Sequence, residues 1–373
     1  MEEKTLRPKY HFTPTYGWMN DPNGLVFYQN RYHLFFQYNP HGLTWDSMHW
    51  GHAISTDLLN WQEQEIALYP DEQGDIFSGS CIVDHENLSG LGTKDNPPLL
   101  AFYTSHNMEN SREMQCLAYS TDGIHFQKHP SNPIIPGQEY TPARDPHVFT
   151  NKILGGYSLC FTTEKEIVFY HSLDLLMWEK TGAFILPEYA LHGMIECPCM
   201  FSCSVSDDTD IKEKYVLMMS MDIPEEEYSK LSEETMPHNR LMQYFVGTFD
   251  GSAFQADREQ QEVLLVDYGP DFYAGSIFSN VDKTILMAWL GNSSASMKIK
   301  TEREGFRGIQ SYPRRLSLCR CDKGYRLHHE FYPRLEDGQP GYLSDMSGET
   351  LVDGCVIDKL GQNGFIPYTS YLY

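Results

Sequence analysis

The sequence predicts an all-β protein, and more narrowly a five-bladed β-propeller. Long helical periodicity is scarce, whereas short alternating or apolar runs bounded by Gly, Pro, Asn and Asp dominate the chain. Five such runs are centred about 57 to 70 residues apart. They occupy residues 32–38, 99–104, 157–162, 215–221 and 284–290. A unit of this length that recurs five times fits a four-stranded blade, and neither a β-sandwich nor a parallel β-helix explains so long a repeat.

A second pattern alternates with these runs and supports the same interpretation. In four places an aspartate is followed four positions later by an aromatic residue. The pairs are Asp57 with Trp61, Asp122 with Phe126, Asp174 with Trp178, and Asp250 with Phe254. An aspartate side chain can close a turn, and the aromatic residue can anchor the next strand. We therefore expect an equivalent turn in each of four blades, with a weak fifth copy near Asp322.

The chain divides into a propeller, residues 1–330, and a short C-terminal extension, residues 331–373. The extension is rich in glycine and acidic residues and contains the run Phe365-Ile366-Pro367-Tyr368. We expect these apolar side chains to dock it on the propeller. An acidic, polar stretch at residues 224–236 predicts a short helix or an excursion within the fourth blade.

Charge and composition exclude several functions. The 373 residues include 28 Lys and Arg against 51 Asp and Glu, a net charge of −23. Such a charge repels phosphate, so nucleic acid and acidic membrane surfaces are unsuitable partners. No apolar run approaches the roughly 20 residues of a membrane span. The aromatic content of 13% suits stacking on sugar rings, and equally a large β core.

The cysteines predict a reducing compartment and no metal site. There are nine, an odd number, and Met1-Glu2-Glu3-Lys4 is not followed by an apolar signal sequence. We therefore expect free thiols and a cytoplasmic location. Cys197 and Cys199 are separated by a single residue, which is not the usual spacing of zinc ligands. His49 and His52 suit either a metal or packing, and we assign them to packing.

Three acidic residues are the candidate catalytic groups. In a propeller the first turns of the innermost strands meet at the central channel, so acids there face one another. Asp21, Asp145 and Glu196 each lie beside or near a proline shortly before a predicted strand. Each alone is explained by a turn or a surface role, but their equivalent places in a repeated unit favour a shared site. Glycoside cleavage uses such a set, and we expect Arg144 to keep Asp145 ionised.

With these acids in view, the chain resembles glycoside hydrolase family 32, the invertase, inulinase and levanase group. The resemblance covers about residues 10 to 320, and the motifs appear in the family's order. The matching stretches are residues 18–24, 36–40, 48–53, 77–80, 144–146, 196–198 and 271–274. Together they are highly specific, although each motif alone is weak.

The resemblance implies a five-bladed propeller and a retaining double displacement at fructose. By this analogy Asp21 is the nucleophile, Glu196 is the general acid/base, and Asp145 stabilises the transition state. Seven further residues match family positions that bind the fructose. They are Trp18, Asn20, Gln37, Trp45, Phe77, Ser78 and Arg144. The resemblance implies no metal and no organic cofactor.

The sequence also departs from the family pattern. Ile195 and Cys199 replace the usual tryptophan and aspartate around Glu196, and Gly275-Ser276 replaces a usual Pro-Gln. Asn292-Ser293-Ser294 stands near Trp289 where the family usually has another tryptophan, and Arg315 replaces the glutamate of a late Pro-Arg-Glu-Leu. We expect some of these changes to face the leaving group. Family members usually carry a C-terminal β-sandwich, whereas only about 40 residues follow the propeller in this sequence.

The predicted function is a β-fructofuranosidase-type hydrolase in the cytoplasm. Its expected substrates are sucrose, sucrose 6-phosphate or short fructo-oligosaccharides. The alternatives are a fructosyltransferase with the same acids and, with less support, a non-catalytic fructan-binding propeller. A basic cluster either meets a sugar phosphate or pairs with surface acids. Its members are Arg303, Arg307, Arg314 and Arg315. A homo-oligomer is left open.

Overall fold

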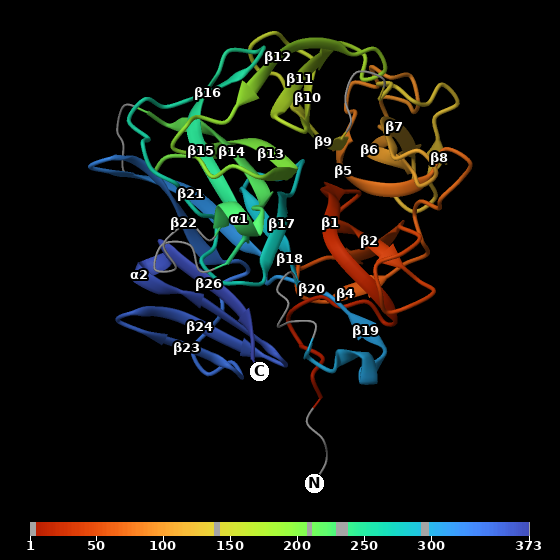
Figure 1. Ribbon diagram of the computed structural model, residues 1–373. Coiled ribbons are helices and arrows are strands. Elements are labelled where there is room, and N and C mark those ends of the chain that lie inside the picture. The colour runs from red at the N-terminus through yellow and green to blue at the C-terminus, as the bar shows by residue number, and fades with distance from the viewer. Residues whose placement is uncertain (1–4, 138–141, 207–210, 229–237, 292–297, 373) are drawn as a thin grey trace.

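The computed structural model describes residues 5–137, 142–206, 211–228, 238–291 and 298–372, and in these residues the strands form six sheets. Five sheets surround a common centre (Figure 1). Their innermost strands are β1 (Gly17–Tyr28), β5 (Asp75–Val83), β9 (Ala143–Thr150), β13 (Met194–Ser204) and β17 (Phe272–Ile277). Each innermost strand contacts the next, and β17 contacts β1, so the ring is closed. The prediction of a five-bladed propeller is confirmed.

Each blade continues outward as an antiparallel sheet. Blade I adds β2 (Arg31–Asn39), β3 (His49–Ser55) and β4 (Trp61–Glu63); blade II adds β6 (Leu99–Asn107), β7 (Arg112–Ser120) and β8 (Gln127–Lys128). Blade III adds β10 (Tyr157–Thr163), β11 (Glu166–Ser172) and β12 (Glu179–Ile185); blade IV adds β14 (Glu213–Asp222), β15 (Arg240–Phe249) and β16 (Phe254–Ala256). Blade V adds β18 (Ile285–Leu290), β21 (Arg314–Cys321) and β22 (Gly324–Phe331), with β20 (Ile309–Gln310) beside β18. The five apolar runs fall on the second strands, which are buried because neighbouring blades pack on both of their faces.

A late segment of the chain completes the first blade. Strand β19 (Phe306–Arg307) pairs in parallel with β1, matching Gly17 with Phe306 and Trp18 with Arg307. The short 3-10 helix η2 (Thr301–Glu304) precedes it, and the Gly17 N–H donates to the Gly305 carbonyl at 3.0 Å. This pairing ties two segments almost 300 residues apart into one sheet.

The predicted aspartate turns are confirmed. The Asp57 carboxylate accepts the backbone N–H groups of Leu59 and Asn60 at 2.9 and 2.8 Å. Asp122, Asp174 and Asp250 each accept two backbone N–H groups in the same way. Burial alone would raise the pKa of Asp57, but its hydrogen bonds lower it to about 2. These four carboxylates therefore stay ionised and hold their turns across the physiological pH range.

The C-terminal residues form a sheet that the sequence analysis did not predict. It contains β23 (Tyr342–Asp345), β24 (Gly348–Asp353), β25 (Val356–Leu360) and β26 (Ile366–Tyr371), with the short helix α2 (Gly361–Gly364) before β26. The expected docking is confirmed in part: the Phe365 ring lies 5.1 Å from His328 of β22, and the Pro367 carbonyl accepts the Tyr268 N–H at 2.9 Å, while Ile366 and Tyr368 are each 37% exposed. Tyr371 also docks: its N–H donates to Asp271 at 3.0 Å and its hydroxyl to the Leu290 carbonyl at 3.1 Å.

A buried charge network joins the C-terminal sheet to the propeller. Arg314 of blade V donates to Asp267 at 2.7 Å and to Asp358 of β25 at 2.8 Å, and it also bonds Thr369. Its guanidinium is fully buried. The possibility that the basic cluster binds phosphate therefore finds no support at Arg314. Arg307 and Arg315 also pair with acids, Glu302 and Glu330 respectively.

The N-terminal segment enters the same network through His11. Its two ring nitrogens lie 2.8 Å from Asp353 and 2.7 Å from Asp358. Burial alone would lower the pKa of His11, but these hydrogen bonds raise it to about 9 from the usual 6.5. His11 is therefore a cation between two buried carboxylates at neutral pH.

The ionised His11 makes the stability of the fold depend on pH. A group whose pKa rises on folding stabilises the native state fully below its unfolded pKa, and this contribution disappears as the pH rises through the folded pKa. We expect His11→Gln to lower the melting temperature most at about pH 6 and least at about pH 9.5. Thermal melts of both proteins across this range measure the difference. A difference that does not change with pH would contradict the assignment.

Two further sequence expectations concern local structure. Helix α1 (Glu225–Tyr228) lies in the acidic stretch where a short helix was predicted, and residues 229–236 of that stretch lie outside the described residues.

His52 is buried, and its Nε2 lies 3.0 Å from Nδ1 of His33. In the described part of the chain, no cluster of His, Cys, Asp and Glu is arranged to hold a metal, and no helix is long and apolar enough to cross a membrane.

Candidate active site

A bulge in every innermost strand aims side chains at the central channel. The register between each innermost strand and its neighbour shifts at an equivalent place. The shifts lie at residues 19–22, 76–79, 144–147, 196–199 and 273–276. Asp21, Asp145 and Glu196 lie near the start of the innermost strands, as predicted, but they lie in bulged strands rather than in turns. A bulge bends a strand and redirects its side chains, which explains how an acid within a sheet reaches the channel.

The bulges place the predicted residues in one pocket of about 520 Å³. All ten predicted site residues line it, including the three acids. Six further residues complete the lining, and the sequence analysis assigned none of them to the site. They are His106, Cys197, Arg240, Tyr273, Trp289 and Gly291. Tyr273 lies in a matching family stretch, whereas Arg240 and His106 lie on outer strands and carry no sequence signal.

Asp21 of blade I is held by donors from two other blades and from its own. Ser78 donates to Oδ2 at 2.6 Å, and the Asn20 amide donates to Oδ1 at 3.1 Å. The Cys197 thiol lies 3.5 Å from Oδ2. Burial raises the pKa of this thiol, so it stays protonated and acts as a donor. These contacts fix the orientation of the Asp21 carboxylate in the pocket.

Asp145 of blade III is the most buried of the three acids. Its backbone N–H donates to the Thr104 hydroxyl at 3.0 Å, and its Oδ2 accepts the Cys197 N–H at 2.8 Å. Burial raises the pKa of Asp145 to about 7, Asp21 adds to this rise, and Arg144 opposes it. The expectation that Arg144 keeps Asp145 ionised is therefore only half met. Arg144 acts in the predicted direction, but the loss of solvent is the larger effect.

Glu196 of blade IV lies among three donors. The Tyr273 hydroxyl donates to Oε2 at 2.7 Å, and Arg144 Nη2 lies 3.4 Å from Oε1. Arg240 Nη2 lies 3.9 Å from Oε2, and its guanidinium covers the Tyr273 ring. Burial raises the pKa of Glu196, while Arg144 and the Tyr273 hydrogen bond moderate the rise. A carboxyl group with a raised pKa can donate a proton near neutral pH.

Aromatic rings form the sides of the pocket. The Phe77 ring stacks on His106 with centroids 4.3 Å apart, and Trp45 meets Phe77 edge-on at 5.9 Å. Trp45 is 46% exposed at the rim. On the opposite side, the Trp18 and Trp289 rings lie 6.2 Å apart. Such a shape, polar at the floor and aromatic at the sides, suits a sugar ring.

Gln37 lies at the floor of the pocket and is almost fully buried. Its amide donates to Asn23 at 2.9 Å and to the Ile76 carbonyl at 2.9 Å. The Trp18 indole donates to the Asn20 carbonyl oxygen at 2.9 Å. Side chains predicted to bind substrate are thus held in place by one another or by the backbone, so the pocket is rigid before any ligand enters.

Several residues that depart from the family pattern do not line the pocket, and residues 292–294, where the family usually has a tryptophan, lie outside the described residues. Ile195 and Cys199 are buried in hydrophobic clusters between blades, and neither lines the pocket. Ile195 is 3% exposed and Cys199 is 1% exposed, because both pack into the core rather than into the channel. Gly275 also lies outside the pocket lining.

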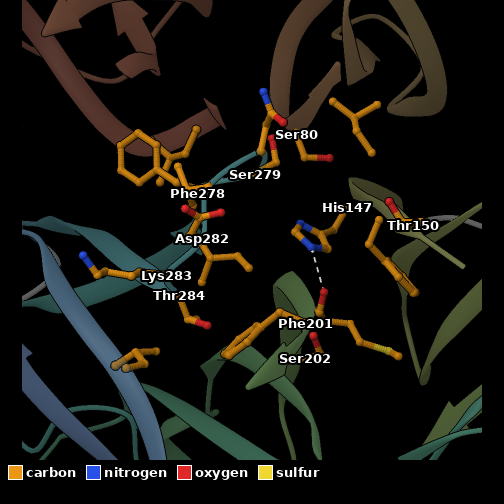
Figure 2. Close-up of a pocket in the computed structure, with 18 of the residues that line it drawn as sticks. Ser80, His147, Thr150, Phe201, Ser202, Phe278, Ser279, Asp282, Lys283 and Thr284 are labelled. Atoms are coloured by element: carbon orange, nitrogen blue, oxygen red, sulfur yellow. Dashed lines mark hydrogen bonds between the residues drawn. The ribbon is translucent and has the colours of Figure 1, made fainter. Parts of the chain in front are cut away.

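Figure 2 shows a second pocket, of about 600 Å³. Its lining includes later residues of the same innermost strands, and none of the ten predicted residues belongs to it. Its central groups are already used by the fold. Ser80 donates to the Pro146 carbonyl and accepts the Val148 N–H, while His147 Nε2 lies 2.9 Å from the Met200 carbonyl (Figure 2). The chemistry therefore belongs to the first pocket.

Comparison with known proteins agrees with this geometry. Residues 11–330 match the model of the glycosyl hydrolases family 32 N-terminal domain. The chain belongs to glycosyl hydrolase family 32. It is 37% identical over 330 residues to a levanase of Bacillus subtilis, and 36% identical over 329 residues to an invertase of Schizosaccharomyces pombe. These matches cover 87% and 84% of the chain, but only 46% and 53% of the relatives, so this family 32 chain spans about half their length.

Solved structures share the fold. The exo-inulinase from Aspergillus awamori superposes with a TM-score of 0.85 at 23% identity, covering 100% of this chain and 94% of that chain. A fructofuranosidase from Schwanniomyces occidentalis, complexed with fructosylnystose, gives a TM-score of 0.83 at 24% identity and covers 100% and 93%. At these identities the comparison establishes the propeller of this family 32 chain.

Proposed function

We propose that this protein is a retaining β-fructofuranosidase that hydrolyses small fructosides. The observation that carries the proposal is the meeting of Asp21, Asp145 and Glu196, from three different blades, in one aromatic-sided pocket. Glycoside hydrolysis needs one carboxylate at the anomeric carbon and one carboxyl group at the leaving oxygen. Membership of a family that includes levanases and invertases supports fructose as the sugar.

The chemistry would proceed in two displacements. Asp21 attacks the anomeric carbon of the fructosyl unit, while Glu196 gives its proton to the leaving oxygen. The bond to the leaving sugar breaks and a covalent fructosyl–Asp21 ester remains. Glu196, now ionised, removes a proton from water, which attacks the same carbon and releases Asp21. The donors around Asp21 support its role as the leaving carboxylate of the second step, since they stabilise the charge that returns to it.

Asp145 would act through hydrogen bonds to the sugar. Its raised pKa means that the empty pocket does not carry three full negative charges near neutral pH. The positive charge that develops on the sugar ring in the transition state favours an ionised Asp145. Its interaction would therefore strengthen as the reaction proceeds, which is the condition for lowering the barrier.

The compartment and the leaving group are part of the proposal. All nine cysteines are free, which supports a reducing cytoplasm. The pocket size and its rigid floor support sucrose, sucrose 6-phosphate and short fructo-oligosaccharides as the substrate class.

The proposal is tested by measuring sugar release from sucrose, sucrose 6-phosphate, kestose and short inulin. We expect free fructose from at least one of these substrates, with retained anomeric configuration in the first product seen by NMR. A transferase would instead build longer oligosaccharides at high substrate concentration. A folded protein that releases no fructose from any of the four would overturn the proposal in favour of fructan binding.

A further inference from the structure

Glu113 is a buried carboxylate outside the predicted site. It lies on β7, the third strand of blade II, and its side chain is 2% exposed. Three donors surround it. The Ala143 N–H donates to Oε2 at 2.7 Å, Arg144 Nη1 donates to Oε1 at 2.9 Å, and His106 Nδ1 lies 3.2 Å from Oε1. Burial alone would raise the pKa of Glu113, but these partners lower it, so the group is a buried anion.

Both side-chain partners of Glu113 belong to the pocket. Arg144 and His106 line it, while Glu113 does not. The His106 ring lies within 3° of parallel to Phe77, so its position also sets the position of that aromatic wall. A single carboxylate thus organises groups from blades II and III on one side of the pocket.

Arg144 divides its guanidinium between two carboxylates. Nη1 bonds Glu113 at 2.9 Å, and Nη2 lies 3.4 Å from Glu196. The adjacent Asp145 and the hydrogen-bonded Glu113 both oppose the charge of Arg144, and the same cation also acts on Glu196. Removing the charge of Glu113 would therefore increase the net positive field at Glu196.

We infer that Glu113 is a positioning residue for the proposed reaction: it holds Arg144 and His106 against the pocket, and it limits the positive charge that Arg144 presents to the acid/base Glu196. This inference rests on the proposed function. Blade II then contributes to the site through Glu113 as well as through the lining residues Phe77 and Ser78.

The direction in which the pKa of Glu196 shifts when Glu113 is neutralised follows from the charges around it. More net positive charge beside Glu196 favours its ionised form, so its pKa falls. The alkaline limb of kcat/KM reports the acid/base of the free enzyme. Asp21, Asp145, Arg240 and Tyr273 also act on Glu196, Asp145 also acts on Arg144, and Asp75 faces His106. None of these groups is altered by a substitution at Glu113.

The experiment compares pH profiles of kcat/KM, with the substrate that the wild-type protein cleaves. We expect Glu113→Gln to move the alkaline limb down by about 0.5 to 1 pH unit. Glu113→Asp keeps the charge but shortens its reach. The alkaline limb of its kcat/KM profile should stay near that of the wild type. Its KM should rise about five-fold, because the shorter side chain no longer holds Arg144 and His106 in place. Glu109→Gln, an exposed acid in the same β6–β7 connection, controls for net charge and should match the wild type.

Tyr273→Phe is a control whose expected shift has the opposite direction to that of Glu113→Gln, because it removes a hydrogen bond that favours the ionised form of Glu196. Its alkaline limb should move up. A limb in Glu113→Gln equal to that of the wild type would overturn the inference. If this variant does not fold, an unchanged KM in Glu113→Asp would overturn it. A wild-type protein without activity on any fructoside overturns the proposed function as well, which separates the two failures.

Discussion

Asp21→Ala is expected to reduce fructose release by about 1,000-fold or more, because it removes the carboxylate that would form the fructosyl ester. The surroundings of Asp21 make this substitution a direct test of its role as the nucleophile. The Ser78, Asn20 and Cys197 side chains that now contact Asp21 remain in place, and none of them is a carboxylate that could replace it. The measurement is the initial rate of fructose release by the wild-type and variant proteins at equal concentration.

A matched control separates catalysis from folding. Asp95→Ala removes an exposed carboxylate from the loop between β5 and β6 and should leave the rate unchanged. Because Asp21 is partly exposed and lies in a preformed pocket, the melting temperature of Asp21→Ala should remain close to that of the wild type. A variant that keeps more than about a tenth of the activity would exclude Asp21 as the nucleophile.

Arg314→Met should give the largest loss of stability, about 3 to 5 kcal/mol in the free energy of unfolding. The substitution leaves Asp267 and Asp358 buried without the cation that they share. A buried carboxylate that loses its partner keeps the full cost of its desolvation. Urea unfolding, followed by intrinsic fluorescence, measures the change.

The neighbouring arginine provides the control for this prediction. Arg315 pairs with Glu330 on the surface, where both side chains are more than 40% exposed. Arg315→Met should cost about 1 kcal/mol or less, because a solvent-exposed ion pair contributes little. Equal losses for the two variants would contradict the assigned role of the buried network. If Arg314→Met does not fold, Arg314→Lys should fold with a smaller loss, since it keeps the charge but not the forked geometry.

The sequence made the propeller predictable because the same local pattern recurs. A buried run and an aspartate turn each depend only on residues that are close together in the chain. Each can therefore be recognised in the sequence of the unit that contains it. The turn at Asp57, for example, uses only residues 55–60. The C-terminal sheet was missed because its strands are short and its buried face mixes apolar side chains with Asp353, Asp358 and Thr369, which point into a charge network. Polar residues at buried positions interrupt the hydrophobic alternation that marks a strand.

Part of the candidate site was also predictable, because its acids lie in short contiguous motifs. The three acids lie in motifs on the innermost strands, where each short sequence shapes its own bulge, and all ten predicted residues line one pocket. Arg240, His106 and Glu113 were missed because they come from second or third strands whose sequences carry no mark of the channel. Only the twist of each blade brings them toward the acids.

By itself, then, the sequence determined the repeat, the aspartate turns, the family and the identity of the three acids, because all of these are written in contiguous residues. The tertiary structure alone decided the electrostatics. Whether Asp145 is ionised depends on burial that outweighs Arg144, and how strongly Arg144 acts on Glu196 depends on Glu113, a residue 31 positions away in the chain. Desolvation and shared ion pairs are properties of atoms gathered from separate blades, and no local pattern records them.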